Sequence, residues 1–255
     1  GYLGKIPELG IEFANFSMRR WGWKVNPEYV RLATDVGVGM VEVLRVVCKP
    51  GDSVLINSPI YQNFFNWLKE TQLNVVDVPF KENQLGWDLD LTAIEDAYKA
   101  GVKVHALCNP HNPLGRLYTK KELENIADLA AKYSVQVLSD EIHAPLTFPG
   151  KEFVPFLAAS QNAAEVGICV TSASKAFNIA GLKSALIVSQ TKEKHELLAQ
   201  MPVSVHFRSS ILGAFAAVEA FNKCDEWLDG ALATIESNAH YLKTLLETHL
   251  PAAKY

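Results

Sequence analysis

Lys175 is the residue with the clearest chemical potential, and it ends the run Thr-Ser-Ala-Ser-Lys at 171–175. The apolar run at 166–170 predicts a buried strand that stops just before this segment. Lysine is rarely buried without a reason, and one that loses its proton by desolvation becomes a nucleophilic amine able to form a Schiff base. An isolated Ser-x-Ser-Lys is more often a surface loop, so the rest of the chain decides between these interpretations.

Three other residues follow predicted strands. Tyr61 comes after the apolar run at 53–57, Asn112 after 103–108 and Asp140 after 135–139. Ligands of open parallel sheets bind at the carboxyl ends of the strands, so all three residues could face one ligand. A packing tyrosine, a simple Asn-Pro turn and a helix cap are the structural alternatives. Asp140 has too few histidine or carboxylate neighbours in the sequence for a metal site, and none is predicted.

A glycine-bearing stretch, Thr-Asp-Val-Gly-Val-Gly at 34–39, leads into a helical pattern. A helix N-terminus offers free backbone N–H groups and the positive end of a dipole, which suit a phosphate. The Asp35 carboxylate would repel a phosphate, so we expect the backbone amides of Val36 and Gly37 to contact it. Taken alone, the stretch is more often a plain strand-to-helix turn.

Strand-like and helix-like segments alternate along the chain and would position these residues. Strand patterns occur at 29–33, 53–57, 74–79, 103–108, 135–139, 166–170 and 184–188, and helical patterns at 6–20, 91–100, 119–130, 192–200, 211–221 and 225–249. Because the alternation repeats about five times, the sequence predicts an α/β fold with a mostly parallel sheet and helices on both faces.

Composition narrows the class of protein. The chain has 255 residues, of which 49% are hydrophobic, enough for a substantial core. The net charge of −4 and the lack of a basic block argue against a nucleic-acid partner. No apolar run reaches membrane-spanning length and no signal peptide is visible, so we expect no membrane partner and a cytoplasmic enzyme. The four scattered cysteines suggest neither zinc nor disulfides.

Four ordered motifs carry a family resemblance over nearly the whole chain. The run Ser-x-Ser-Lys-x-Phe-Asn-x-Ala-Gly-Leu at 172–182 resembles the cofactor-lysine segment of fold-type I pyridoxal-phosphate (PLP) enzymes. The doubled Asn-Pro run at 109–115 is similar to a signature of fold-type I aminotransferases and lyases, and Ser-Pro-Ile-Tyr at 58–61 fits the same pattern. Asp-Glu-Ile-His at 140–143 looks like the cystathionine β-lyase-like (MalY/PatB-type, C–S lyase) branch.

The resemblance implies a role for each residue around the cofactor ring. Lys175 would hold PLP and, once freed by the substrate, remove the α-proton as general base. Asp140 would keep the ring nitrogen protonated, which favours the electron sink. Tyr61 would stack on the ring, and Asn112 would bind its phenolic oxygen. His143 stands where many aminotransferases have tyrosine.

The resemblance also implies how the phosphate is held. The hydroxyls of Ser172 and Ser174 and the backbone of Val36 and Gly37 would contact it. Lys183 replaces the arginine of classical aminotransferases, so its pairing would be monodentate. Tyr2 matches a tyrosine that a neighbouring subunit supplies in this family, which implies a homodimer with shared active sites.

Family members are longer than this chain and carry the arginine that binds the substrate carboxylate in a C-terminal small domain. We therefore expect residues 1–30 to lead into the large domain, 31–245 to form the PLP-binding large domain, and 246–255 to begin the small domain. This division makes the chain a large-domain fragment.

The expected activity is β-elimination of a sulfur amino acid to pyruvate, ammonia and a thiol. A class I/II aminotransferase is the first alternative, since it shares the early steps with the lyase. A regulatory or binding module is the second.

Overall fold

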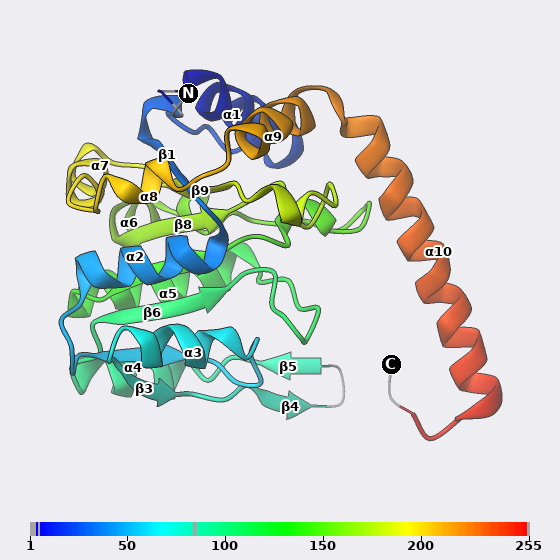
Figure 1. Cartoon of the computed structure of the whole chain (residues 1–255). Helices are drawn as coiled ribbons and strands as arrows, with labels where there is room; N and C mark the ends of the chain where they lie inside the picture. Colours follow the sequence, from blue (N-terminus) through cyan, green and yellow to red (C-terminus); the bar gives the residue numbers. More distant parts are fainter. Residues whose placement is uncertain (1–3, 5, 84–85, 254–255) are drawn as a thin grey trace.

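The computed structural model describes residue 4 and residues 6–83 and 86–253. A seven-stranded sheet with the order β1-β9-β8-β7-β6-β2-β3 lies at its centre (Figure 1). The strands are β1 (Val30–Ala33), β2 (Ser53–Ile56), β3 (Asn74–Asp77), β6 (Val104–Cys108), β7 (Gln136–Asp140), β8 (Gly167–Thr171) and β9 (Ala185–Val188). Only β9 runs antiparallel to its neighbours in this sheet, as the described residues show. The predicted mostly parallel α/β sheet is confirmed.

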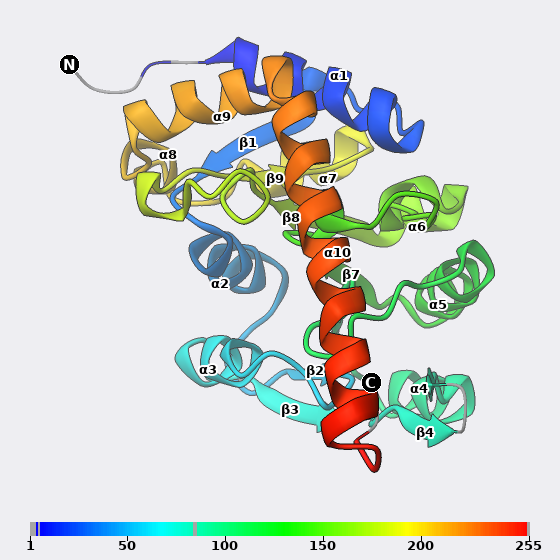
Figure 2. The same cartoon turned by 90° about the vertical axis from the view of Figure 1, so that its right-hand side faces the viewer.

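Helices cover both faces of the sheet, as the end-on view of Figure 2 shows. The helices are α1 (Pro7–Trp21), α2 (Val36–Val47), α3 (Asn63–Glu70), α4 (Leu91–Lys99), α5 (Lys120–Tyr133), α6 (Gln161–Val166), α7 (Lys192–Leu198), α8 (Ser204–Phe207), α9 (Ile211–Lys223) and α10 (Asp225–His249). Helices α2 and α3 lie on one face, and α4, α5 and α6 lie on the other. A small hairpin, β4 (Lys81–Asn83) and β5 (Gly86–Asp88), lies beside the sheet.

Two hydrophobic cores follow from the alternation of side chains along the central strands. On β7, Val137 packs into the core beneath α1 and α5, whereas its neighbour Leu138 packs into the core beneath α2 and α3. On β8, Cys169 and Val170 divide in the same way. The strands are apolar on both faces because both are covered, which is why they appear in the sequence as continuous apolar runs.

Helix starts are set by local hydrogen bonds. Asp35 caps α2, with its Oδ1 accepting from the Val38 amide at 2.8 Å. Thr119 and Glu122 form a capping box at the start of α5. Because α2 directly follows β1, its capped N-terminus lies at the carboxyl edge of the sheet.

Helix α10 leaves the body of the protein. Of its 25 residues, Leu228 and Leu232 are buried, and the helix runs alongside the sheet on the side where the strand arrows end (Figures 1 and 2). The helix is continuous through residue 245, where the sequence analysis ended the large domain. That division remains a prediction. Among the described residues, no helix has the length and apolar character needed to cross a membrane.

Candidate functional site

A cavity of about 350 Å³ lies at the carboxyl ends of the parallel strands. Its wall includes nine residues predicted from the sequence, namely Val36, Gly37, Tyr61, Asn112, Asp140, His143, Ser174, Lys175 and Lys183. They come from five segments far apart in the chain, so the sheet topology brings them together. Of the other two predicted residues, Tyr2 lies outside the described residues, and Ser172 is buried behind the cavity wall.

Asp140 is the buried acid of the cavity. It is the last residue of β7, only 5% exposed, and its Oδ1 accepts a hydrogen bond from the Ile142 amide at 3.1 Å. Burial raises the pKa of Asp140 to about 7, and the Ile142 amide and the Lys175 charge oppose that rise. A cationic ligand beside Asp140 would stabilise the carboxylate form, so this acid can be ionised at neutral pH when such a ligand is bound. Burial also lowers the pKa of His143, and the Lys175 charge acts in the same direction.

Lys175 lies in the turn that follows β8. The Ser172 hydroxyl accepts from the Ser174 amide at 3.0 Å, and the Phe177 amide donates to the Ala173 carbonyl at 3.0 Å. These bonds fix the backbone on both sides of the lysine. The Lys175 side chain is exposed on the cavity wall. The described residues therefore do not bury its amine, although the sequence had suggested burial.

Tyr61 and Asn112 are joined through their backbones. The Tyr61 amide donates to the Asn112 carbonyl at 3.0 Å, and the Asn112 amide donates to Cys108 Sγ at 3.3 Å. The Tyr61 ring is 43% exposed and meets Trp67 edge-on, with 6.2 Å between the ring centroids. An exposed ring face in a cavity can stack on a planar ligand.

The N-terminus of α2 and Lys183 form the cationic side of the cavity, and the Asp35 carboxylate also lines this side. Lys183 lies there, and its Nζ is 3.1 Å from Asp35 Oδ2. Val36 and Gly37 begin the helix, and a Cβ added at Gly37 would come within 3.1 Å of Trp67 Nε1. Glycine therefore leaves space at a helix end that favours anions.

Trp67, Cys108 and Ser184 are among the lining residues that were not predicted from the sequence. Trp67 sits on α3, Cys108 ends β6, and Ser184 precedes β9. Cys108 carried a signal, since it directly precedes the Asn-Pro motif. Ser184 carried none, because its position depends on how β9 pairs with its neighbours. His111, inside the Asn-Pro motif, is buried, and its Nε2 lies 3.2 Å from the Asn57 carbonyl oxygen.

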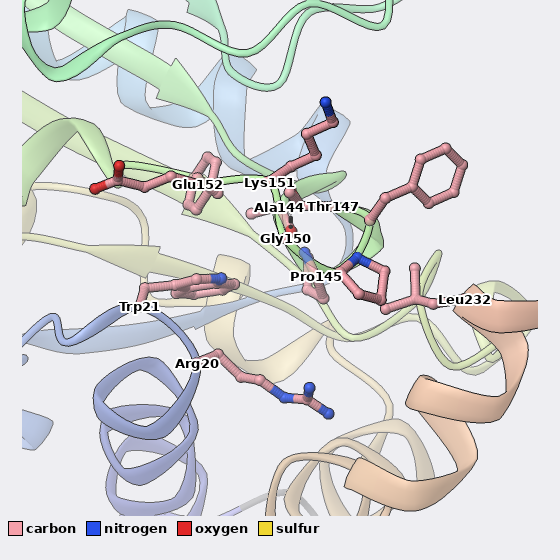
Figure 3. A pocket seen from close by; sticks show the side chains of 12 residues that line it. Arg20, Trp21, Ala144, Pro145, Thr147, Gly150, Lys151, Glu152 and Leu232 are labelled. Atoms are coloured by element: carbon pink, nitrogen blue, oxygen red, sulfur yellow. Dashed lines mark hydrogen bonds between the residues drawn. The ribbon is translucent and has the colours of Figure 1, made fainter. Parts of the chain in front are cut away.

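A second, larger hollow of about 440 Å³ lies between the end of α1, the loop after His143 and the start of α10 (Figure 3). It contains none of the predicted site residues. Its Arg20 guanidinium is already paired, with Nε 3.1 Å from Asp225 and Nη1 2.6 Å from Asp229. The smaller cavity is therefore the better candidate site. Among the described residues, no cluster of three or more His, Cys, Asp or Glu side chains could hold a metal ion.

The open α/β sheet, with an amine, a buried acid and an anion-favouring helix end around one cavity, defines a domain built to bind a small organic anion. Comparison with known proteins then gives the family. Residues 5–254 match the family described as aminotransferase class I and II, and the chain belongs to this family.

Individual relatives are similar over nearly the whole chain. Cystathionine beta-lyase PatB of Bacillus subtilis is 32% identical, with 100% of this chain and 66% of that protein covered. Cystathionine beta-lyase of Corynebacterium glutamicum is also 32% identical, with 97% and 65% covered. The crystal structure of cystalysin from Treponema denticola, which contains a pyridoxal 5'-phosphate cofactor, is 29% identical with a TM-score of 0.91, over 99% of this chain and 64% of that chain. The chain thus spans less than two thirds of the length of these relatives.

Proposed function

We propose that this chain is the cofactor-binding part of a PLP-dependent C–S lyase of the cystathionine β-lyase type. The observation that carries the proposal is that Lys175 and Asp140 line one cavity together with the N-terminus of α2. The relatives named as cystathionine beta-lyases support the choice of reaction.

The residues of the cavity fit PLP. An acid that burial leaves ready to pair with a cation suits the protonated ring nitrogen, and Asp140 is such an acid. The exposed face of Tyr61 suits the ring, and the amides of Val36 and Gly37 with Lys183 suit the phosphate. Ser184 adds a buried hydroxyl without a hydrogen-bond partner among the described residues. Together they match an aromatic ligand with a cationic ring and an anionic arm.

PLP supplies, when bound, an electron sink conjugated to the substrate α-carbon. The chain's own residues would position the reactants and move the proton. The Lys175 amine would accept the α-proton, and Asp140 would hold the proton on the ring nitrogen. Removal of that proton by Lys175 would leave the C–H electron pair to form the α,β double bond of the substrate as its C–S bond breaks and a thiolate leaves. Hydrolysis of the released enamine would give pyruvate and ammonia.

An aminotransferase is the second candidate, because the family that matches includes enzymes of that name. It would use Lys175 and Asp140 in the same way until the α-proton is removed. The final destination of that proton separates the two reactions.

Incubation of the whole protein with cystathionine and PLP tests the proposal. The lyase releases pyruvate and free thiol in equal amounts without added keto acid. An aminotransferase gives neither product until a keto acid is added, and a regulatory or binding module gives neither at all. Either of those outcomes would refute the proposed reaction.

We also propose that the protein works in the cytoplasm as a homodimer with shared active sites. The dimer rests on the resemblance of Tyr2 to a residue given across the interface. Gly4, close to Tyr2 in the chain, is tied by its carbonyl to His206 Nε2 at 3.1 Å.

A further inference from the structure

Ser184 carries a buried hydroxyl that the described residues leave without a partner. The residue is 8% exposed, and its Oγ makes no hydrogen bond within the part of the chain that the structure describes. A buried polar group without a partner costs free energy, and most such groups in native proteins are satisfied. Ser184 also lines the cavity that holds Lys175. Ser184 therefore brings an unpaired hydroxyl to the edge of that cavity, with the oxygen itself buried among the described residues.

The backbone around Ser184 is fixed from several sides. The Ser184 carbonyl accepts the Ser172 hydroxyl at 2.6 Å, and the Lys183 carbonyl accepts the Ser210 amide at 3.2 Å. Lys183 itself adopts a left-handed conformation with φ of 57°. The Ser172 hydroxyl already donates its proton here, whereas the Ser184 hydroxyl has none of these bonds. The Ser184 hydroxyl is thus an unpaired hydrogen-bond donor, among the described residues, on a backbone whose position is fixed.

The sheet register places Ser184 beside the N-terminus of α2. Ala185 pairs with Ala33, the last residue of β1, and α2 begins three residues later at Val36. Asp140 lies on β7, and the whole of β8 separates that strand from β9. Ser184 therefore belongs to the cationic side of the cavity, with Lys183, and not to the side of the buried acid.

We infer that Ser184 is a further cofactor-binding residue, whose hydroxyl donates a hydrogen bond to the phosphate group of PLP. The inference rests on the proposed binding of PLP and adds a ligand that the sequence motifs do not include. A hydrogen bond to a charged group is strong enough to change cofactor affinity about ten- to a hundredfold.

The test compares PLP with pyridoxal, which lacks the phosphate, in the whole protein. The dissociation constants are measured through the quenching of tryptophan fluorescence, since Trp67 lines the cavity. Ser184→Ala should raise the dissociation constant of PLP at least tenfold and leave that of pyridoxal within twofold. Ser189→Ala is the matched control, because Ser189 is a buried serine at the far end of β9 whose Oγ contacts the Tyr29 carbonyl at 3.4 Å.

Thermal unfolding separates ligand binding from a structural role. Without PLP, Ser184→Ala should unfold at the same temperature as the parent or higher, because it removes an unsatisfied hydroxyl. Addition of PLP should raise the unfolding temperature of the variant by less than it raises that of the parent. Unchanged PLP affinity, equal weakening of PLP and pyridoxal, or a less stable cofactor-free variant would each overturn the inference. Failure of the parent protein to bind PLP would instead refute the proposed function.

Discussion

Burial of the ionisable Asp140 side chain makes the free energy of unfolding depend on pH. Its pKa is about 7 in the folded protein, well above its ordinary value of 3.8, because burial disfavours the charge. Between these two values the folded state keeps a proton that the unfolded chain releases. The free energy of unfolding of the cofactor-free protein should therefore fall as pH rises from about 4 to 7, by about 4 kcal/mol from this group.

Asp140→Asn should remove that part of the pH dependence, as urea unfolding at several pH values would measure. Glu141, whose pKa burial also raises to about 7, should keep its own contribution in the variant. The same variant should lose at least a hundredfold in turnover with PLP while remaining folded, since the proton on the ring nitrogen loses its acceptor. Near-normal turnover, or an unchanged stability profile, would contradict this role.

Asp35 is a residue that opposes the proposed phosphate site. Its carboxylate caps α2 and pairs with Lys183 Nζ at 3.1 Å, so it places a negative charge beside the anion site. Asp35→Asn keeps a side chain able to cap the helix and frees the lysine. The dissociation constant of PLP should fall about two- to fivefold, since exposed pairs are worth less than about 1 kcal/mol. Weaker binding in a folded variant would show that the carboxylate assists the site.

At the scale of elements, a helix cap depends on a few neighbouring residues, so substitution of the capping residue measures its contribution to the free energy of unfolding. Thr119 Oγ1 accepts from the Glu122 amide at 3.2 Å, which satisfies one free donor at the start of α5. Thr119→Ala should reduce the free energy of unfolding by about 1 kcal/mol, whereas Thr119→Ser should keep most of it. Equal stability of the two variants in urea would show that the Thr119 hydroxyl contributes nothing to the cap.

The central strands were predictable because periodicity and turn residues mark them. The run at 135–139 corresponds to β7, one residue further along, and the helix predicted at 225–249 is α10. The reversed direction of β9 was not predictable, since an apolar run has no direction. The β4–β5 hairpin was missed because its short strands are largely exposed and carry no apolar alternation.

The candidate site was predictable to the extent that its residues sit in motifs. Asp140 could be singled out because it follows the predicted strand at 135–139, and Asn112 because it lies in the Asn-Pro motif after the strand at 103–108. Ser184 belongs to no motif and reaches the cavity through the pairing of β9 with β1, so only the structure could reveal it. The exposure of Lys175 likewise depends on which elements surround it, which local sequence does not determine.

At the scale of the whole molecule, the proposed dimer is the next question. The chain covers 54% to 66% of the length of the relatives that it matches, so assembly has to be tested on the whole protein. Light scattering should give twice the mass of one chain. If Tyr2 contacts the phosphate as the family resemblance implies, Tyr2→Phe should raise the PLP dissociation constant about ten- to a hundredfold without changing that mass, since one hydrogen bond to a charged group would be lost. A monomer that binds PLP tightly and turns over would rule out shared sites.

The most direct test of the central claim is to locate the lysine that holds PLP. The whole protein is loaded with PLP, reduced with borohydride and digested, and the labelled peptide is identified by mass. The label should be on Lys175, both in the parent and in Lys183→Ala at saturating PLP. A label on any other lysine, or none at all, would contradict the account.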